Sequence, residues 1–185
     1  IFFKGCPLRC KWCSNPEGLQ RKYQIMFKPT TCVSCGSCVP VCPQKIHSIS
    51  ADGVHLIDRE IDCIGCGACV EACIPDALKV AGQQESISSL MEYIEQDRAF
   101  YEQSGGGVTL GGGEVTSQPE AAINLLMACK QDGFHTAIET CGYVKKDVLM
   151  RFAEFVDLFL FDLKHIDPER HFELTGVRNE KIGRA

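Results

Sequence analysis

The chain has 185 residues, 45% of them hydrophobic, which is enough to bury a core in one medium domain or two small ones. Its formal net charge of −5 argues against a nucleic-acid-binding surface. The longest apolar run is too short to cross a bilayer, and no signal peptide is recognisable. We therefore expect a cytoplasmic protein that binds neither nucleic acid nor membrane.

The length also limits the fold. A complete (β/α)₈ barrel takes about 250 residues, so any barrel here is expected to be partial. The chain starts without Met inside an expected strand, and residues 179–185 stop without a finished element. The sequence therefore predicts a fragment of a longer chain.

The predicted elements alternate between strands and helices along most of the chain, and this alternation is typical of a parallel sheet. We expect four βα units. In chain order the predicted elements are a strand at 1–3, a small strand at 54–57, a helix at 87–103 capped by Ser86, a strand at 108–110, a helix at 118–132, a strand at 135–139, a helix at 146–155, a strand at 158–162 and a helix from Asp167 to Gly176.

Cysteine is unusually frequent, with 13 residues. An odd number of cysteines at short spacings is a poor disulfide framework. In a chain without an export signal, such clusters more often bind metal.

Eight of the cysteines form two runs with the same spacing, C-x₂-C-x₂-C-x₃-C, at 32–42 and 63–73. This is the bacterial ferredoxin pattern for [4Fe–4S] clusters, in which the last cysteine of each run ligates the other cluster. Zinc is the alternative, because CxxC pairs also occur in zinc ribbons. The predicted ligands are Cys32, Cys35, Cys38 and Cys73 for one cluster, and Cys63, Cys66, Cys69 and Cys42 for the other.

A third group, Cys6-x₃-Cys10-x₂-Cys13, is one ligand short of a complete site. Three thiolates on a cubane cluster leave one iron with an open coordination position, although a broken zinc site or chance could give the same spacing. The group follows an apolar strand, and the aromatic Trp12 directly precedes its last cysteine. This loop resembles the signature of the radical S-adenosylmethionine (SAM) superfamily. The resemblance implies that the three cysteines hold a [4Fe–4S] cluster whose open iron is chelated by SAM.

Further motifs follow three of the predicted strands, at the end where barrel active sites lie. The first ends in Gly112-Gly113-Glu114, which alone could be a flexible linker. It resembles the family's Gly-Gly-Glu-Pro motif, although Val115 stands in place of Pro. The resemblance implies that the glycine backbone supports the methionine end of SAM and that Glu114 helps to hold its ammonium group.

The other two motifs are Glu139-Thr140-Cys141-Gly142 and Asp162-Leu163-Lys164. Their charged side chains could be ordinary surface groups. The resemblance implies that Glu139 and Thr140 help to bind a monovalent cation beside SAM. It also implies that Lys164 binds the SAM carboxylate and that Asp162 contacts the cation or the lysine. The predicted SAM-binding residues are Trp12, Gly112, Gly113, Glu114, Glu139, Thr140, Asp162 and Lys164.

Two cysteines are left over. Cys129 lies in an apolar helical run and is expected to be a small core residue. Cys141 follows Thr140 and receives no metal role.

The matching stretches resemble the glycyl-radical-enzyme activating enzymes, and within them the subgroup with a ferredoxin-like insert. The implied fold is α/β, a truncated (β/α)₆ radical SAM barrel with an inserted domain that holds two [4Fe–4S] clusters. The stretches that carry the resemblance are 4–17, 104–114, 162–164 and 174–177. The expected domains are 1–27 with the first strand and the cluster loop, 28–82 with the insert, and 83–185 with the remaining βα units.

The resemblance implies an activity with three [4Fe–4S] clusters and SAM. One electron cleaves SAM to methionine and a 5′-deoxyadenosyl radical, which takes a hydrogen atom from a glycine of a partner glycyl radical enzyme. Flavodoxin or another low-potential reductant would supply the electron. The sequence at 111–116 is similar to that of choline trimethylamine-lyase activators, while activators of diol dehydratases, 4-hydroxyphenylacetate decarboxylase and arylsuccinate synthases share the layout.

Two other functions remain open. A ferredoxin-type electron carrier fused to an unrelated α/β domain would explain eight cysteines but not the three-cysteine loop. The other is a radical SAM enzyme whose auxiliary clusters bind substrate directly, which the presence of all eight cysteines of the two runs disfavours because both clusters would be fully ligated.

Overall fold

The computed structural model describes residues 1–180 and 182. The chain divides into two compact units. One unit consists of Ile1–Gln20 together with Glu85–Ala185, and the other is Arg21–Gln84. Among the described residues, none of the helices is long and apolar enough to cross a membrane.

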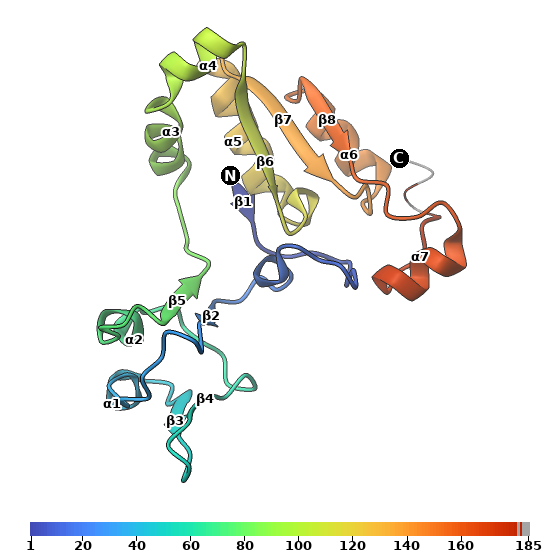
Figure 1. Cartoon of the computed structure of the whole chain (residues 1–185). Helices are drawn as coiled ribbons and strands as arrows, with labels where there is room; N and C mark the ends of the chain where they lie inside the picture. The colour runs from blue at the N-terminus through green and yellow to red at the C-terminus, as the bar shows by residue number, and fades with distance from the viewer. Residues whose placement is uncertain (181, 183–185) are drawn as a thin grey trace. The chain divides into compact units, whose positions relative to one another are not determined.

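The first unit is built on a four-stranded sheet in the order β1 (Phe2–Phe3), β6 (Gly107–Gly112), β7 (His135–Thr140) and β8 (Leu158–Phe161). All three pairings are parallel, as the alternation of strands and helices predicts. Figure 1 shows β6, β7 and β8 side by side with their arrows pointing the same way. The carboxyl ends of the strands therefore meet at one edge, and the motifs that follow them are brought together there.

Helices pack against this sheet through a continuous apolar core. Leu110 of β6, Ile138 of β7, Leu126 of α5 and Phe152 of α6 are fully buried in it. Cys129 is also fully buried there, which confirms its prediction as a core residue. The helical elements of the unit are η1 (Pro16–Gly18), α3 (Ile87–Glu95), α4 (Arg98–Ser104), η2 (Val115–Ser117), α5 (Pro119–Gln131), α6 (Lys146–Ala153) and α7 (Pro168–Thr175).

The single helix predicted at 87–103 is wrong in one respect, because the structure breaks it into α3 and α4. Ser86 caps α3 as predicted, accepting a hydrogen bond from the Ser89 amide. At the break Asp97 leaves the helical conformation, and its carbonyl accepts the amides of the next turn. Arg98 then lies over the Phe134 ring, 4.3 Å from its centre. Asp has a low helix propensity, so interrupting the helix at Asp97 costs little, and Arg98 can make this contact.

The second unit contains two short antiparallel strand pairs. Strand β2 (Gln24–Phe27) pairs with β5 (Leu78–Ala81), and β3 (His47–Ile49) pairs with β4 (His55–Ile57). The small strand predicted at 54–57 corresponds to β4, whereas β2, β3 and β5 were not predicted. Two one-turn helices, α1 (Cys38–Val41) and α2 (Ala68–Glu71), carry the third cysteine of each run.

The backbone of the second unit repeats along with its cysteines. Positive φ angles recur at matching places in the two runs: Ser34 with Gly65, Gly36 with Gly67, and Lys45 with Asp76. Three of these residues carry a Cβ, which makes this conformation unfavourable for them. The loop around each group of cysteines therefore imposes its own backbone shape, whatever residue stands at the position.

Candidate functional site

The three-cysteine loop lies at the carboxyl edge of the sheet, beside a solvent-open pocket of about 900 Å³. Every residue predicted to bind the first cluster or SAM lines this space, which we call the open pocket. Besides these it is lined by Leu8, Ser14, Asn15, Leu19 and Cys141, which the sequence did not indicate. The predicted residues around the open pocket are Cys6, Cys10, Trp12, Cys13, Gly112, Gly113, Glu114, Glu139, Thr140, Asp162 and Lys164.

Backbone hydrogen bonds hold the loop from two sides. The Cys6 amide donates to the carbonyl of Leu19 at 3.0 Å. Beyond it, the Arg9 amide donates to Thr175 at 2.7 Å and the Lys11 amide to Leu174 at 3.0 Å. The end of α7 therefore braces the cysteine loop. This contact gives a structural reason for the stretch 174–177 that the sequence singles out.

The two glycines of the Gly-Gly-Glu motif are required by backbone packing. The Gly113 amide donates to Phe3 at 2.8 Å, and a Cβ on Gly113 would meet the carbonyl oxygens of Gly5 and Gly18. Gly112 has a φ of +106° and no room for a Cβ beside Phe3. The flexible-linker interpretation is therefore wrong, because this stretch is the end of β6 packed on the cysteine loop.

Glu114 is buried, and its carboxylate is fixed by several donors. Oε1 accepts from the Thr116 amide at 3.1 Å, from Thr116 Oγ1 at 2.7 Å and from Thr140 Oγ1 at 2.7 Å. Oε2 accepts from the Cys141 amide at 2.8 Å, and the Cys141 thiol also hydrogen-bonds this carboxylate. The carboxylate lines the open pocket, where its negative charge can attract a cationic group, and Thr140 helps to hold it in place.

Lys164 and Asp162 form an ion pair at the rim of the same pocket. The Lys164 side chain is only 18% exposed, which distinguishes the pair from an ordinary surface ion pair. Burial lowers the pKa of Lys164, but the hydrogen bond to Asp162 and the nearby Cys10 and Cys141 thiols outweigh it and raise the pKa. Lys164 in turn opposes the rise that burial causes in the pKa of Cys10. A fixed positive charge therefore stands beside a thiol that must be deprotonated to bind iron.

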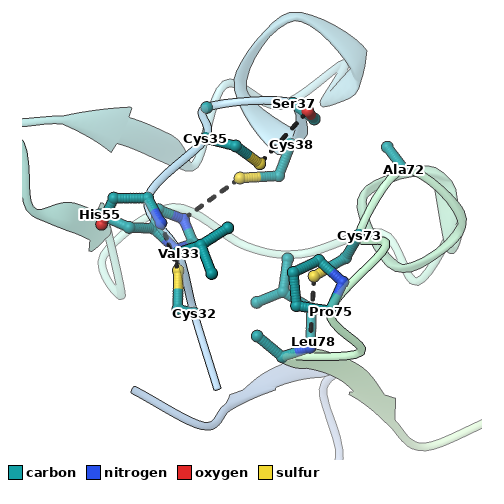
Figure 2. Close-up of a pocket in the computed structure, with 13 residues that line it drawn as sticks. Cys32, Val33, Cys35, Ser37, Cys38, His55, Ala72, Cys73, Pro75 and Leu78 are labelled. Carbon is teal, nitrogen blue, oxygen red and sulfur yellow. Dashed lines mark hydrogen bonds between the residues drawn. The ribbon is translucent and has the colours of Figure 1, made fainter. Parts of the chain in front are cut away.

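The second unit contains a pocket of about 330 Å³, which we call pocket A. It is lined by Cys32, Cys35, Cys38 and Cys73, whose side chains converge on it in Figure 2. Three of these come from one run and the fourth from the other. The Ser34 amide donates to Cys32 Sγ at 3.4 Å, and the Ala77 amide donates to Cys73 Sγ at 3.2 Å.

The matching pocket B has about 280 Å³ and is lined by the other four cysteines of the two runs, Cys42, Cys63, Cys66 and Cys69. Gly65 donates its amide to Cys63 Sγ at 3.4 Å, as Ser34 does in pocket A. Burial, together with the neighbouring thiols Cys42 and Cys63, raises the pKa of Cys69 to about 11. The structure thus brings together the two sets of four sulfurs that the spacing indicates. That they hold [4Fe–4S] clusters stays a prediction.

The donor sets fit this chemistry. All thirteen cysteines are free thiols, and each of the pockets A and B offers four soft sulfur ligands with backbone amides donating to sulfur. Four gathered thiols repel one another as thiolates, and a bound metal cluster compensates that charge. Zinc would accept the same ligands, so the distinction from iron comes from the spacing.

A pair of histidines beside pocket A was missed by the sequence analysis. His55 Nε2 lies 3.4 Å from Cys38 Sγ and 3.0 Å from His47 Nδ1, while His55 Nδ1 lies 3.7 Å from Cys32 Sγ. Both rings are buried, and burial lowers the pKa of each. Of the two rings, His55 lines the pocket and His47 contacts His55. The pairing of β3 with β4 brings the two rings together, and a single sequence does not show that pairing.

Residues 60–185 match the family model described as the radical SAM superfamily, which is more than half of the chain. The chain belongs to the radical SAM superfamily. A 4Fe-4S dicluster domain matches residues 24–74, which include both four-cysteine runs. The three-cysteine loop lies outside both matched ranges, so its assignment depends on its own pattern and on the open pocket.

Curated relatives of this radical SAM chain are activating enzymes. It is 64% identical over 183 residues to the choline trimethylamine-lyase activating enzyme of Oleidesulfovibrio alaskensis, covering 98% of this chain and 59% of that protein. It is 45% identical to the trans-4-hydroxy-L-proline dehydratase activating enzyme of Clostridioides difficile, covering 98% of this chain and 60% of that one. The chain therefore spans about 60% of the length of these relatives.

Among solved structures, a domain of pyruvate-formate lyase-activating enzyme from Bacteroides vulgatus is 37% identical to this chain. The match covers 43% of this chain and 49% of the other, with a TM-score of 0.40.

Proposed function

We propose that this chain is part of a radical SAM activating enzyme that cleaves SAM reductively and generates a glycyl radical on a partner enzyme. The observation that carries the proposal is the open pocket, where the three cysteines of one loop meet an anchored carboxylate and an anchored ammonium group. We further propose that the parallel sheet is part of a (β/α)₆ barrel interrupted by the ferredoxin-like insert.

The residues of the open pocket have distinct roles in this proposal. Cys6, Cys10 and Cys13 would hold the cluster, Oε2 of Glu114 would accept the ammonium group of SAM, and the Lys164 ammonium would pair with its carboxylate. The cluster held there would supply the electron for reductive cleavage of SAM, and the hydrogen atom would come from a glycine Cα of the partner enzyme.

The remaining polar residues position these groups. Thr116 and Thr140 hold the Glu114 carboxylate at the pocket by hydrogen bonds to Oε1. Asp162 holds Lys164 and keeps it charged. We propose that Glu139, which also lines the pocket, contributes to a monovalent cation site together with Thr140. Trp12 would cover one side of the bound SAM.

The test of the activity is anaerobic iron loading of the full-length protein, followed by iron counting and EPR with and without SAM. We expect about twelve irons, a signal that shifts when SAM binds, and 5′-deoxyadenosine as a product. About eight irons and no response to SAM would overturn the proposal in favour of a ferredoxin-type electron carrier.

For pockets A and B we propose two further [4Fe–4S] clusters that relay electrons from flavodoxin or a similar low-potential reductant. The eight clustered sulfurs and the matched dicluster domain support this. We expect Cys35→Ala, which removes the cluster of pocket A, to slow activation with a protein reductant much more than with dithionite. Equal rates for the variant and the wild type with the protein reductant would contradict the relay and leave partner docking as the role of the insert.

For the partner we propose choline trimethylamine-lyase, because the relative that is 64% identical is named for activating it. The test is glycyl radical formation, measured by EPR on purified choline trimethylamine-lyase and on a trans-4-hydroxy-L-proline dehydratase. We expect the radical on the first enzyme. A radical on the second enzyme alone would replace the proposed partner while leaving the chemistry in place.

A further inference from the structure

The two pockets of the insert share their backbone but differ in one buried feature. Strand β4, which pairs with β3, carries a lining residue of pocket A, and β2, which pairs with β5, carries a lining residue of pocket B. The residue opposite Ile49 is His55, and the residue opposite Val80, at the matching place in the other pair, is Ile25. His55 lines pocket A as Ile25 lines pocket B. Among the described residues lining pocket B, none is a histidine.

His55 is close enough to the sulfurs of pocket A to donate a hydrogen bond to one of them. Its Nδ1 lies 3.7 Å from Cys32 Sγ and its Nε2 lies 3.4 Å from Cys38 Sγ, and Figure 2 shows both contacts. The ring is 5% exposed and packs edge-on against Phe27, with ring centres 4.9 Å apart. A ligated cysteine sulfur only accepts hydrogen bonds, and a neutral imidazole has one N–H to give.

His47 decides which nitrogen of His55 carries that proton. His47 Nδ1 lies 3.0 Å from His55 Nε2, so one of these nitrogens must donate to the other. The remaining nitrogen of His47, Nε2, is buried without a hydrogen-bond partner among the described residues. An unpaired N–H is less tolerable in a protein interior than an unpaired acceptor. The favoured arrangement therefore has the His47 proton on Nδ1, donated to His55 Nε2, which leaves the His55 proton on Nδ1, facing Cys32.

We propose that His55, with its tautomer fixed by His47, donates a hydrogen bond to Cys32 Sγ and raises the reduction potential of the cluster held in pocket A. This inference rests on the proposed ligation of a [4Fe–4S] cluster by the four cysteines of that pocket. Hydrogen bonds to ligand sulfurs disperse negative charge and stabilise the reduced cluster. Pocket B, with Ile25 in the matching place, lacks this donor. The two clusters are therefore unequal although their ligand loops repeat.

The test is an EPR-monitored redox titration of the full-length, anaerobically loaded protein. Cys35→Ala and Cys66→Ala, which remove one insert cluster each, assign the signals of pockets A and B. His55→Ile copies the environment of pocket B into pocket A. We expect it to lower the equilibrium constant for reduction of the pocket A cluster about tenfold, which is about 59 mV for one electron. The cluster of pocket B serves as the internal control, and its reduction potential should not change.

His55→Asn is the matched variant, because its side-chain amide reaches the place of Nδ1 and can still donate to Cys32. In this variant the equilibrium constant for reduction of the pocket A cluster should stay within a factor of two of the wild-type value. If His55→Ile fails to load pocket A, His47→Leu decides instead, because it leaves His55 and every cysteine in place and should also lower the potential.

A loaded pocket A whose potential is the same in the wild type, His55→Ile and His47→Leu would overturn the hydrogen bond and leave the proposed function standing. An equal shift in the reduction potentials of both insert clusters would also overturn the hydrogen bond, because such a shift would indicate a general change of the insert. A wild-type protein without any cluster in pocket A would overturn both the inference and the proposed role of the insert.

Discussion

The open pocket and pockets A and B offer cysteine sulfur in very different settings. The open pocket, of about 900 Å³, has the three cysteines of one loop, Cys141 from outside that loop, and the charged residues Glu114, Asp162 and Lys164. Pockets A and B have four cysteines each, in about 330 and 280 Å³, and are otherwise lined largely by apolar residues and small loop residues. Where the loop supplies only three sulfurs, the chain provides space and charges of both signs. This is what a zwitterionic ligand at an incompletely ligated cluster needs, whereas an electron-transfer cluster needs four protein ligands.

The largest expected effect separates the two kinds of pocket directly. Cys10→Ala and Cys66→Ala should each remove about four irons of about twelve, because each loses a ligand of one cluster. With dithionite as reductant, Cys10→Ala should reduce SAM cleavage to background while Cys66→Ala retains it. The measurements are iron content and 5′-deoxyadenosine by chromatography. Loss of cleavage in both variants would show that pocket B takes part in the chemistry.

A smaller effect is expected from the charge of the open pocket. Lys164→Met should weaken SAM binding about 10- to 100-fold, because a buried charge-assisted hydrogen bond contributes about 1.5–3 kcal/mol. Lys11→Met is the control, since Lys11 is exposed and its ion pair with Glu173 is long, at 3.9 Å. The dissociation constant can be followed by the SAM-induced EPR change. Similar constants for both variants would contradict the role of Lys164.

A third prediction concerns the stability of the sheet at Asp157, which lines neither the open pocket nor pockets A and B. Its carboxylate accepts from Lys130 Nζ at 2.7 Å and from the Thr136 amide at 2.9 Å, and these bonds lower its pKa from 3.8 to about 2. Because the pKa is lower in the folded than in the unfolded state, the Asp157 carboxylate stabilises the fold at pH values above 3.8. This contribution is lost as the pH falls from 3.8 towards 2.

Asp157→Asn should therefore lower the free energy of unfolding by about 1 kcal/mol near neutral pH, the exposed position reducing the effect. The difference from the wild type should vanish near pH 2. Urea unfolding of the metal-free protein across this range measures it, and iron content after loading should not change. A difference that persists at the lowest pH would mean that the charge of Asp157 is not the cause.

The smallest effect is expected at Cys141, whose thiol faces the open pocket. Burial, followed by the neighbouring Glu114 carboxylate, raises the pKa of Cys141 well above its usual value, which opposes metal binding. Cys141→Ala should leave both the iron content and the SAM-induced EPR shift unchanged. Loss of about four irons would identify Cys141 as a fourth ligand and remove the distinction between the open pocket and the other two.

The sequence predicts much of the candidate site because the relevant residues stand at fixed places on regular elements. Parallel strands end at one edge, so the residues after β6, β7 and β8 had to meet the cysteine loop that follows β1. Cysteine spacing likewise indicates which sulfurs share a pocket.

The missed residues depend on pairings that a single sequence does not show. His47 meets His55 beside pocket A through the pairing of β3 with β4, and Cys141 lines the open pocket, where its amide donates to Glu114. The break at Asp97 was missed because helical periodicity continues across it, and the contact of Arg98 with Phe134 that accompanies the break joins residues far apart in the sequence.

The brace between the cysteine loop and α7 has a consequence for how the protein is made. The amides of Arg9 and Lys11 are held by carbonyls of Leu174 and Thr175, which the ribosome adds more than 160 residues later. At about 5–20 residues per second this is a delay on the order of ten seconds. The three cysteines of this loop are therefore fixed in place only after both four-cysteine runs have been made, so iron delivered during translation would meet pockets A and B before a finished three-cysteine loop.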